Sequence, residues 1–147
     1  MIVRKAKIKE FDKILPLVIQ GAKDFHKSLE DPNPISEKSI SIYLSEIIKY
    51  FPCFVLEENN KIVGCAPLMA EQNVYTEQYI MTLFMIYILP KNRKNGGFTA
   101  LLDAIVDFCV ENKLQFMDTF TSRRNPAALS RVVEKSGLKC NGILVRL

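Results

Sequence analysis

The chain has 147 residues, of which 48% are hydrophobic and 24% are charged, and its formal net charge at pH 7 is +4. This length and composition predict one soluble globular domain, residues 1–147, with a substantial hydrophobic core. The mild positive charge suits a small polyanionic ligand as well as nucleic acid, so the charge does not decide between them. No long apolar run follows the charged N-terminal residues, so we expect no signal peptide and a cytoplasmic protein.

Metal and membrane classes are disfavoured by the distribution of a few residue types. Cysteine occurs four times, without Cys-x-x-Cys spacing, at Cys53, Cys65, Cys109 and Cys140, and His26 is the only histidine. We therefore expect reduced, mostly buried thiols, no metal and no Cys-His nucleophile. The apolar run Ile80–Leu89 has about half of the roughly 20 residues that a membrane helix needs, so we expect a buried strand and no membrane association.

The first third of the chain predicts one short strand and two helices. Residues Ile2–Ile8 alternate weakly, as a short strand does, and Glu10–Ser28 carries apolar residues at helical spacing. Pro16 implies a kink in that helix, or a start nearer to Lys13. After a proline-containing loop, Ser36 or Ser39 would cap a second helix that ends at Tyr50. Its expected inner face consists of Ile40, Tyr43, Leu44, Ile47 and Ile48.

The middle third predicts an antiparallel meander. Cys53–Glu57 and Lys61–Ala70 have strand character, and the residues Glu58-Asn59-Asn60 between them are typical of a hairpin turn. A further polar turn spans Glu71–Thr76. Tyr79–Leu89 is then expected to be one strand that is apolar on both faces, as a central strand covered by helices would be.

The last third predicts alternating helices and strands. Gly97–Asn112 has a helical apolar stripe, and Gln115–Thr121 is a short strand. Asn125 and Pro126 would begin a helix over Ala127–Lys135, Gly137 would end it, and Ile143–Arg146 would be a final strand. The predicted fold class is α/β, with a mixed, mostly antiparallel central sheet and helices on both faces.

The turn Pro90–Phe98, between the apolar strand and the helix that follows, carries the strongest functional signal. Its sequence is Pro-Lys-Asn-Arg-Lys-Asn-Gly-Gly-Phe. The first N–H groups of a helix lack intrahelical partners and carry partial positive charge, and glycines allow an anion to approach the backbone closely. The turn therefore predicts a phosphate or pyrophosphate site. The alternative is that Gly96-Gly97 only ends the strand and that the lysines keep the turn soluble.

The order of elements and two motifs resemble the GNAT family of N-acetyltransferases over nearly the whole chain. The first motif is Ile86-x-Ile88-x-Pro90-x-x-Arg93-x-x-Gly96-x-Phe98. It is similar to the family pattern, in which a strand is followed by Arg or Gln, any two residues, Gly, any one residue, and then Gly or Ala. The second runs from Asn125 to Leu138 and is similar to an Asn-headed family helix that ends in Glu-Lys-x-Gly-Phe. The resemblance implies the GNAT-like acyl-CoA N-acyltransferase fold.

The resemblance further implies that the ligand is acetyl-CoA, as a cosubstrate. Its pyrophosphate would lie on the backbone N–H groups after Arg93, and its pantetheine arm would pair with the main chain of the Ile86–Leu89 edge. The implied cofactor-binding residues are Ile86, Ile88, Arg93, Lys94, Asn95, Gly96, Gly97, Phe98 and Asn125. Three residues depart from the family pattern: Phe98 replaces Gly or Ala, Val133 replaces a thiolate-protonating tyrosine, and Thr82 stands where some members have a glutamate base.

Both usual acid–base positions therefore lack their usual side chain, which leaves other candidates. A base acting through water could be Asp118, Glu77 or Glu71, and an acid could be Tyr87, Tyr79 or Ser130. Asp118 is preferred among the carboxylates because it lies within an apolar strand, where a carboxylate needs a partner such as a substrate amine. The alternative is that Asp118 only bonds backbone or an arginine. The catalytic candidates that we retain are Asp118, Glu77 and Tyr87.

Three functions are compatible with the sequence. The preferred one is acetyl-CoA-dependent acetylation of a primary amine, on a small molecule or a protein, by direct attack in a ternary complex. A catalytically degenerate CoA-binding or regulatory module is the alternative. Nucleic-acid binding by the basic turn is disfavoured, because it needs exposed aromatic residues between the basic ones. No motif identifies the acceptor amine, and we expect a monomer or a homodimer.

Overall fold

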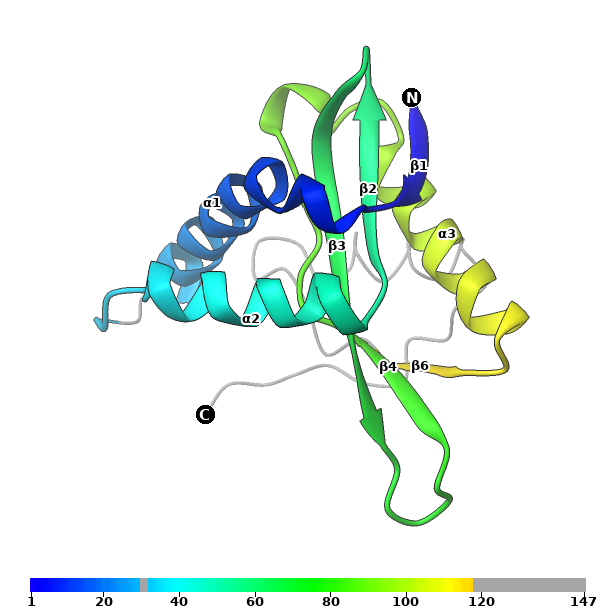
Figure 1. Ribbon diagram of the computed structural model, residues 1–147. Coiled ribbons are helices and arrows are strands. Elements are labelled where there is room, and N and C mark those ends of the chain that lie inside the picture. Colours follow the sequence, from blue (N-terminus) through cyan, green and yellow to red (C-terminus); the bar gives the residue numbers. More distant parts are fainter. Residues whose placement is uncertain (30–31, 118–147) are drawn as a thin grey trace.

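The structure is a computed structural model that describes residues 1–29 and 32–117 (Figure 1). Its helices are η1 (Ile8–Glu10), α1 (Phe11–Leu29), α2 (Glu37–Tyr50), η2 (Pro90–Asn92) and α3 (Gly97–Glu111), where η denotes a short 3-10 helix. Its strands are β1 (Ile2–Lys5), β2 (Cys53–Glu58), β3 (Lys61–Gln72), β4 (Tyr79–Leu83), β5 (Tyr87–Ile88) and β6 (Gln115–Met117). The helix and strand expected after residue 117 lie outside the described residues.

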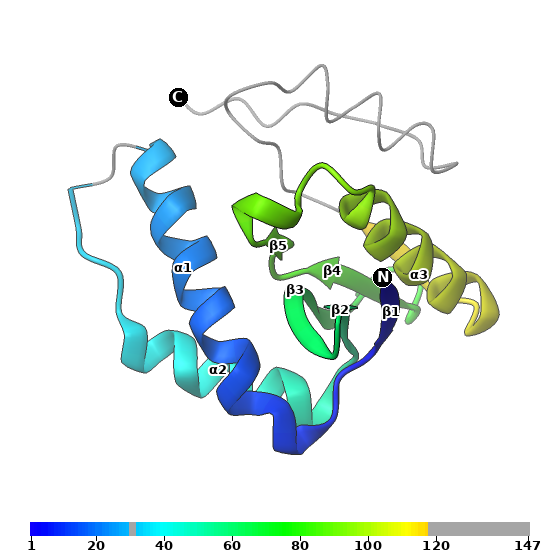
Figure 2. The same ribbon diagram turned by 90° about the horizontal axis from the view of Figure 1, so that it is seen from above.

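One mixed sheet organises the fold. The strand order is β1-β2-β3-β4-β6, and β5 pairs with β3 beside this path. All pairs are antiparallel except β4 with β6, which are parallel. Since α1 and α2 lie on one side of the sheet and α3 lies on the other (Figure 2), the predicted α/β class with helices on both faces is confirmed.

Each face of the sheet has its own hydrophobic core, because successive residues of a strand point to opposite faces. In β2, Phe54 and Leu56 face α3, whereas Cys53 and Val55 face α1 and α2. The α3-side core consists of Phe54, Leu56, Val63, Ala66, Leu68, Met81, Leu83, Ile88, Leu101, Ile105 and Cys109. The α1-side core consists of Ile14, Leu17, Val18, Leu44, Ile48, Cys53, Val55, Cys65, Met85 and Tyr87.

The expected single strand over Tyr79–Leu89 is wrong, because the structure divides it into β4 and β5. Leu83 pairs with Leu68 and Tyr87 pairs with Cys65, so three residues on this side oppose two on β3. One of those two is Pro67, which has no N–H to donate to a strand ladder. The extra residue and the missing donor together account for the break, which separates the pairing of β4 from that of β5.

The hairpin between β2 and β3 has the predicted tight turn. Asn59 and Asn60 have φ angles of 50° and 60°, and Glu58 pairs with Lys61 across them. Positive φ at both central residues defines a type I′ turn, which asparagine tolerates and which matches the twist of the strands. The position of Glu58 at the tip of this hairpin is therefore set by local sequence.

The helix boundaries agree with the sequence at the caps and differ at two details. Ser36 caps α2 by accepting a hydrogen bond from the N–H of Ser39. α1 begins at Phe11 and continues through Pro16, so a start near Lys13 is wrong. Tyr43, expected on the inner face of α2, is 60% exposed. The rest of the expected inner face is confirmed, since Leu44, Ile47 and Ile48 are buried and Ile40 packs against the α1-side core.

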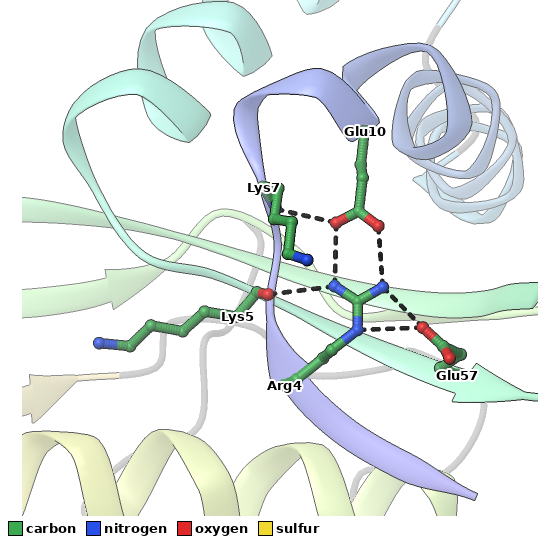
Figure 3. Close-up of polar contacts among 5 residues, drawn as sticks. All are labelled: Arg4, Lys5, Lys7, Glu10 and Glu57. Carbon is green, nitrogen blue, oxygen red and sulfur yellow. Dashed lines mark hydrogen bonds and ion pairs between the residues drawn. The ribbon is translucent and has the colours of Figure 1, made fainter. Parts of the chain in front are cut away.

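A three-residue ionic cluster attaches β1 to β2 and to the start of α1 (Figure 3). The Arg4 guanidinium donates to both carboxylate oxygens of Glu10, at 2.8 and 2.9 Å, and to Glu57, at 2.6 and 3.0 Å. Glu10 also accepts the N–H of Lys7 at 2.8 Å. These hydrogen bonds, with that from Arg4 the largest cause, lower the pKa of Glu10 to about 2.

The low pKa of Glu10 predicts an acid-sensitive contribution to stability. A carboxyl whose pKa is lower in the folded state stabilises the fold above its unfolded pKa, and this contribution is lost as the pH falls towards about 2. Lowering the pH from about 5 to about 2 should therefore reduce the melting temperature more in the parent than in Glu10→Gln. Glu46→Gln, on the exposed side of α2, is the control and should behave like the parent. Equal acid sensitivity of the parent and Glu10→Gln would contradict the assignment.

Candidate functional site

The N-terminus of α3 presents backbone N–H groups that have no acceptor within the helix. Gly96 is the N-cap residue, and the first intrahelical hydrogen bond runs from the N–H of Ala100 to the carbonyl of Gly96, at 3.0 Å. The N–H groups of Gly97, Phe98 and Thr99 precede that bond and have no intrahelical acceptor. They point out of a helix of 15 residues, whose dipole makes this end positive. The arrangement is that of an anion-binding site.

The two glycines of the turn have different roles. Gly96 is exposed and has a φ of 73°, and apart from its chain neighbours no described residue has an atom within 4 Å of the position that a Cβ would take. Gly97 is buried, and a Cβ there would lie 2.5 Å from Cδ2 of Leu56. Gly97 thus allows α3 to pack closely on β2, while Gly96 adopts a left-handed conformation at the exposed start of the helix.

The side chain of Phe98 packs inward. Its side chain is half-buried and contacts the α3-side core, to which the fully buried Leu101 also belongs. The N–H of Phe98 nevertheless lies among the unpaired donors of the helix end. A bulky residue where the family pattern has glycine or alanine is therefore compatible with an anion site formed by main-chain groups.

The side chain of Arg93 connects the turn to β5 and α1. Its Nε donates to the carbonyl of Ile88 at 2.8 Å, and its Cζ lies 5.4 Å from the ring centroid of Tyr87. Its Nη2 lies 3.7 Å from Oδ2 of Asp24 on α1. Arg93 therefore fixes the geometry of the turn and shares its charge with Asp24, which leaves the exposed Lys91 and Lys94 as the less engaged cations of the turn.

Tyr87 belongs to the α1-side core, beneath Arg93. A Cβ at Gly21 of α1 would lie 3.0 Å from Cδ2 of Tyr87, so α1 packs tightly against this ring. Burial, with a further contribution from the carboxylate of Asp24, raises the pKa of the Tyr87 phenol. The phenol is therefore protonated at neutral pH and is suited to donate a proton or a hydrogen bond, not to act as a base.

The strand edge around Tyr87 has one free side in the described part of the chain. There, β5 pairs only with β3, whereas β4 pairs with both β3 and β6. Ile86 precedes β5 and is half-buried, and Ile88 is buried with its carbonyl accepting from Arg93. Among the described residues, β5 therefore has one edge without a strand partner, at the place where the sheet is interrupted.

Of the remaining catalytic candidates that the structure describes, Glu77 lies away from the start of α3. Glu77 is exposed, in the turn between β3 and β4, and this hairpin points away from the start of α3 in Figure 1. Thr82 is buried in β4, and its Oγ1 has no hydrogen-bond partner among the residues that the structure describes. Asp118 and Asn125 lie outside the described residues.

Sequence reasoning missed Asp24, Glu58 and Asn92. Asp24 reaches Arg93 from α1, and Glu58 accepts a hydrogen bond from Nδ2 of Asn92, which is buried in η2. The type I′ turn after Glu58 could have drawn attention to that residue as a fixed hairpin-tip carboxylate. Nothing in the local sequence distinguishes Asp24 from other exposed residues of α1.

Neither a metal nor a membrane element is found in the part of the chain that the structure describes. No group of three or more His, Cys, Asp or Glu residues there could hold a metal ion, and no described helix is long and apolar enough to cross a membrane. Cys53, Cys65 and Cys109 are free and buried, and burial raises the pKa of each thiol, that of Cys53 to about 12. These thiols are therefore unreactive core residues.

Comparisons with known proteins agree with this geometry. The sequence pattern of the Acetyltransferase (GNAT) family matches residues 22–135, which is more than half of the chain. No curated protein sequence matches the chain significantly.

Among solved structures, a predicted acetyltransferase with acetyl-CoA from Clostridium acetobutylicum has a TM-score of 0.73 and 20% identity, over 99% of this chain and 94% of that chain. An aminoglycoside acetyltransferase from an uncultured soil metagenomic sample, in complex with sisomicin, has a TM-score of 0.72 and 15% identity, over 99% and 93%. Ribosomal-protein-alanine N-acetyltransferase from Brucella melitensis biovar Abortus 2308 has a TM-score of 0.67 and 14% identity, over the whole of both chains. At such identities the likeness concerns the fold.

Proposed function

Because this chain belongs to the GNAT family of acetyltransferases, we propose that it transfers the acetyl group of acetyl-CoA to a primary amine, by direct attack in a ternary complex. The observation that carries the proposal is the open N-terminus of α3. Its unpaired N–H groups, the space above Gly96 and the exposed Lys91 and Lys94 suit the pyrophosphate of CoA. The acetyl-CoA in the structure from Clostridium acetobutylicum supports the same donor.

The break between β4 and β5 suggests where the pantetheine arm and the thioester of acetyl-CoA would bind. The pantetheine arm would lie along the free side of β5, where Ile86 and Ile88 offer main-chain groups. The thioester would then lie near the break between β4 and β5. In the described residues this break borders both Tyr87 and the buried hydroxyl of Thr82, which lies on the β4 segment before it.

We propose only the chemical class of the acceptor, which is a primary amine. The similar structures include an aminoglycoside acetyltransferase and a ribosomal-protein-alanine acetyltransferase. The acceptors named for these proteins are thus a small molecule in one case and a protein in the other. We expect the helices α1 and α2 to select the acceptor, because they cover the face of the sheet to which Tyr87 belongs.

Proton transfer is proposed to need no dedicated side chain. A neutral amine attacks the thioester carbon, the C–S bond breaks, and the amine loses its extra proton to water. The CoA thiolate takes up a proton, for which the protonated phenol of Tyr87 is a candidate donor. Asp118 and Glu77 remain candidates for accepting a proton through water, although Glu77 lies in the distant β3–β4 turn.

The experiment that tests the function has two parts. Calorimetric titration with CoA measures donor binding, and release of free CoA thiol from acetyl-CoA over a panel of amines measures transfer. Binding together with amine-dependent thiol release supports the enzyme. Binding without turnover on any amine would favour a CoA-binding or regulatory module, and absence of binding would overturn the proposal.

A pH–rate profile tests the proton path. We expect turnover to rise with pH towards the pKa of the acceptor amine, because only the neutral amine attacks. Loss of a single acid–base side chain should change turnover by less than about tenfold, because no single group is essential for the proton transfer. The variants to compare are Tyr87→Phe, Glu77→Gln and Asp118→Asn. If one of them abolished turnover while CoA still bound, a dedicated catalytic residue would exist.

A further inference from the structure

The tip of the β2–β3 hairpin is attached to the turn that begins α3. Glu58, the last residue of β2, accepts a hydrogen bond from Nδ2 of Asn92 and a longer one, at 3.5 Å, from Nδ2 of Asn95. These contacts join positions that are 34 and 37 residues apart in the sequence. The carboxylate thus links a rigid hairpin to the segment that leads into the unpaired donors.

Both ends of this link are fixed by other contacts, and the side chain of Glu58 connects them. The type I′ turn at Asn59 and Asn60 fixes Glu58, as described above. Asn92 is 7% exposed, and its N–H donates to the carbonyl of Leu89 at 2.8 Å. Within the described residues, Oδ1 of Asn92 has no donor, so Glu58 supplies the only hydrogen bond to this buried amide. Removing Glu58 would leave both polar atoms of the amide unpaired, which is costly in a buried place.

We propose that Glu58 is a positioning residue for the anion-binding turn. Through Asn92 and Asn95 it holds the backbone before Gly96, so that the N–H groups of Gly97, Phe98 and Thr99 converge before the ligand arrives. Donors that are already oriented bind an anion without the cost of ordering the turn. That CoA is the anion rests on the proposed function, whereas the ordering of the turn by Glu58 does not.

Two substitutions separate the reach of this side chain from its charge. Glu58→Gln keeps the length and an accepting oxygen without the charge. Glu58→Asp keeps the charge but is shorter by one methylene and no longer contacts Asn92. If positioning matters, Glu58→Asp should behave like Glu58→Ala, and Glu58→Gln should behave like the parent.

Glu57→Ala is the matched control, because Glu57 is the neighbouring carboxylate of the same strand. It accepts hydrogen bonds from Arg4, at 2.6 and 3.0 Å, and these described hydrogen bonds do not involve the turn. Its loss should lower stability without affecting the turn. The control therefore distinguishes a general weakening of the hairpin from a specific loss of order before α3.

Two measurements are made on each full-length variant. Amide hydrogen exchange by mass spectrometry, in peptides that cover residues 90–99, should become at least about threefold faster in Glu58→Ala and Glu58→Asp, because local order is lost. Calorimetric Kd values for CoA should rise by about tenfold in the same two variants, because the donors are misplaced. Glu58→Gln and Glu57→Ala should match the parent in both measurements.

The outcomes are distinguishable. Unchanged amide exchange and unchanged CoA affinity in Glu58→Ala would overturn the proposal. So would changes in Glu57→Ala as large as those in Glu58→Ala. The proposal would also be wrong if Glu58→Asp behaved like the parent while Glu58→Gln lost order and affinity. If Glu58→Ala did not fold, the Asp and Gln pair would still decide. A parent protein that does not bind CoA would overturn the proposed function, while the exchange data would still test the role of Glu58.

Discussion

Replacing Gly96 with valine should weaken CoA binding by about a hundredfold, because a side chain would occupy the space through which the ligand approaches the α3 donors. The position is open, since apart from its chain neighbours no described residue has an atom within 4 Å of the place of a Cβ, and a side chain there would meet the ligand. A β-branched residue at a φ of 73° also strains the backbone, by about 1–3 kcal/mol. Calorimetric titration with CoA measures the first effect and urea denaturation the second.

Two variants separate the blocked approach from the backbone strain. Gly96→Asn tolerates the left-handed conformation but still places a side chain in the open space, so its stability should be retained and its affinity reduced. Lys113 has a φ of 53° just beyond the other end of α3, and Lys113→Val should cost stability without affecting CoA binding. Parent-like affinity of Gly96→Asn would show that the ligand does not pass over Gly96.

Leu101→Ala should lower the free energy of unfolding by about 3–4 kcal/mol, as truncation of a buried leucine does when a cavity remains. Leu101 is 0% exposed and attaches the second turn of α3 to the α3-side core. Val110→Ala, at a position that is 71% exposed on the same helix, is the control and should change stability by less than about 0.5 kcal/mol. Equal losses in the two variants, measured by urea denaturation, would contradict the packing of α3.

The sequence determined the elements whose signals are local. The two asparagines that form the β2–β3 turn, the serine that caps α2 and the apolar stripe of α3 all appear in the structure where the sequence predicts them. The turn before α3, which we propose as the anion site, was predictable for the same reason, since a glycine at a helix start acts through its own backbone and the next N–H groups. The order of the elements also predicted the sheet with helices on both faces, because an antiparallel meander precedes alternating helices and strands.

Only the tertiary structure decided how the site is completed. The break between β4 and β5 depends on register against Pro67 of β3, which no pattern within Tyr79–Leu89 reveals. Arg93 meets Asp24 of α1, and Asn92 meets Glu58 of β2, because folding brings together residues that are far apart along the chain. Such contacts depend on where whole elements pack, and exposed-looking charged residues give no local sign of their future partners. The periodicity of a segment therefore determines its own shape, whereas the partners of its polar side chains are determined by the packing of the sheet and helices around it.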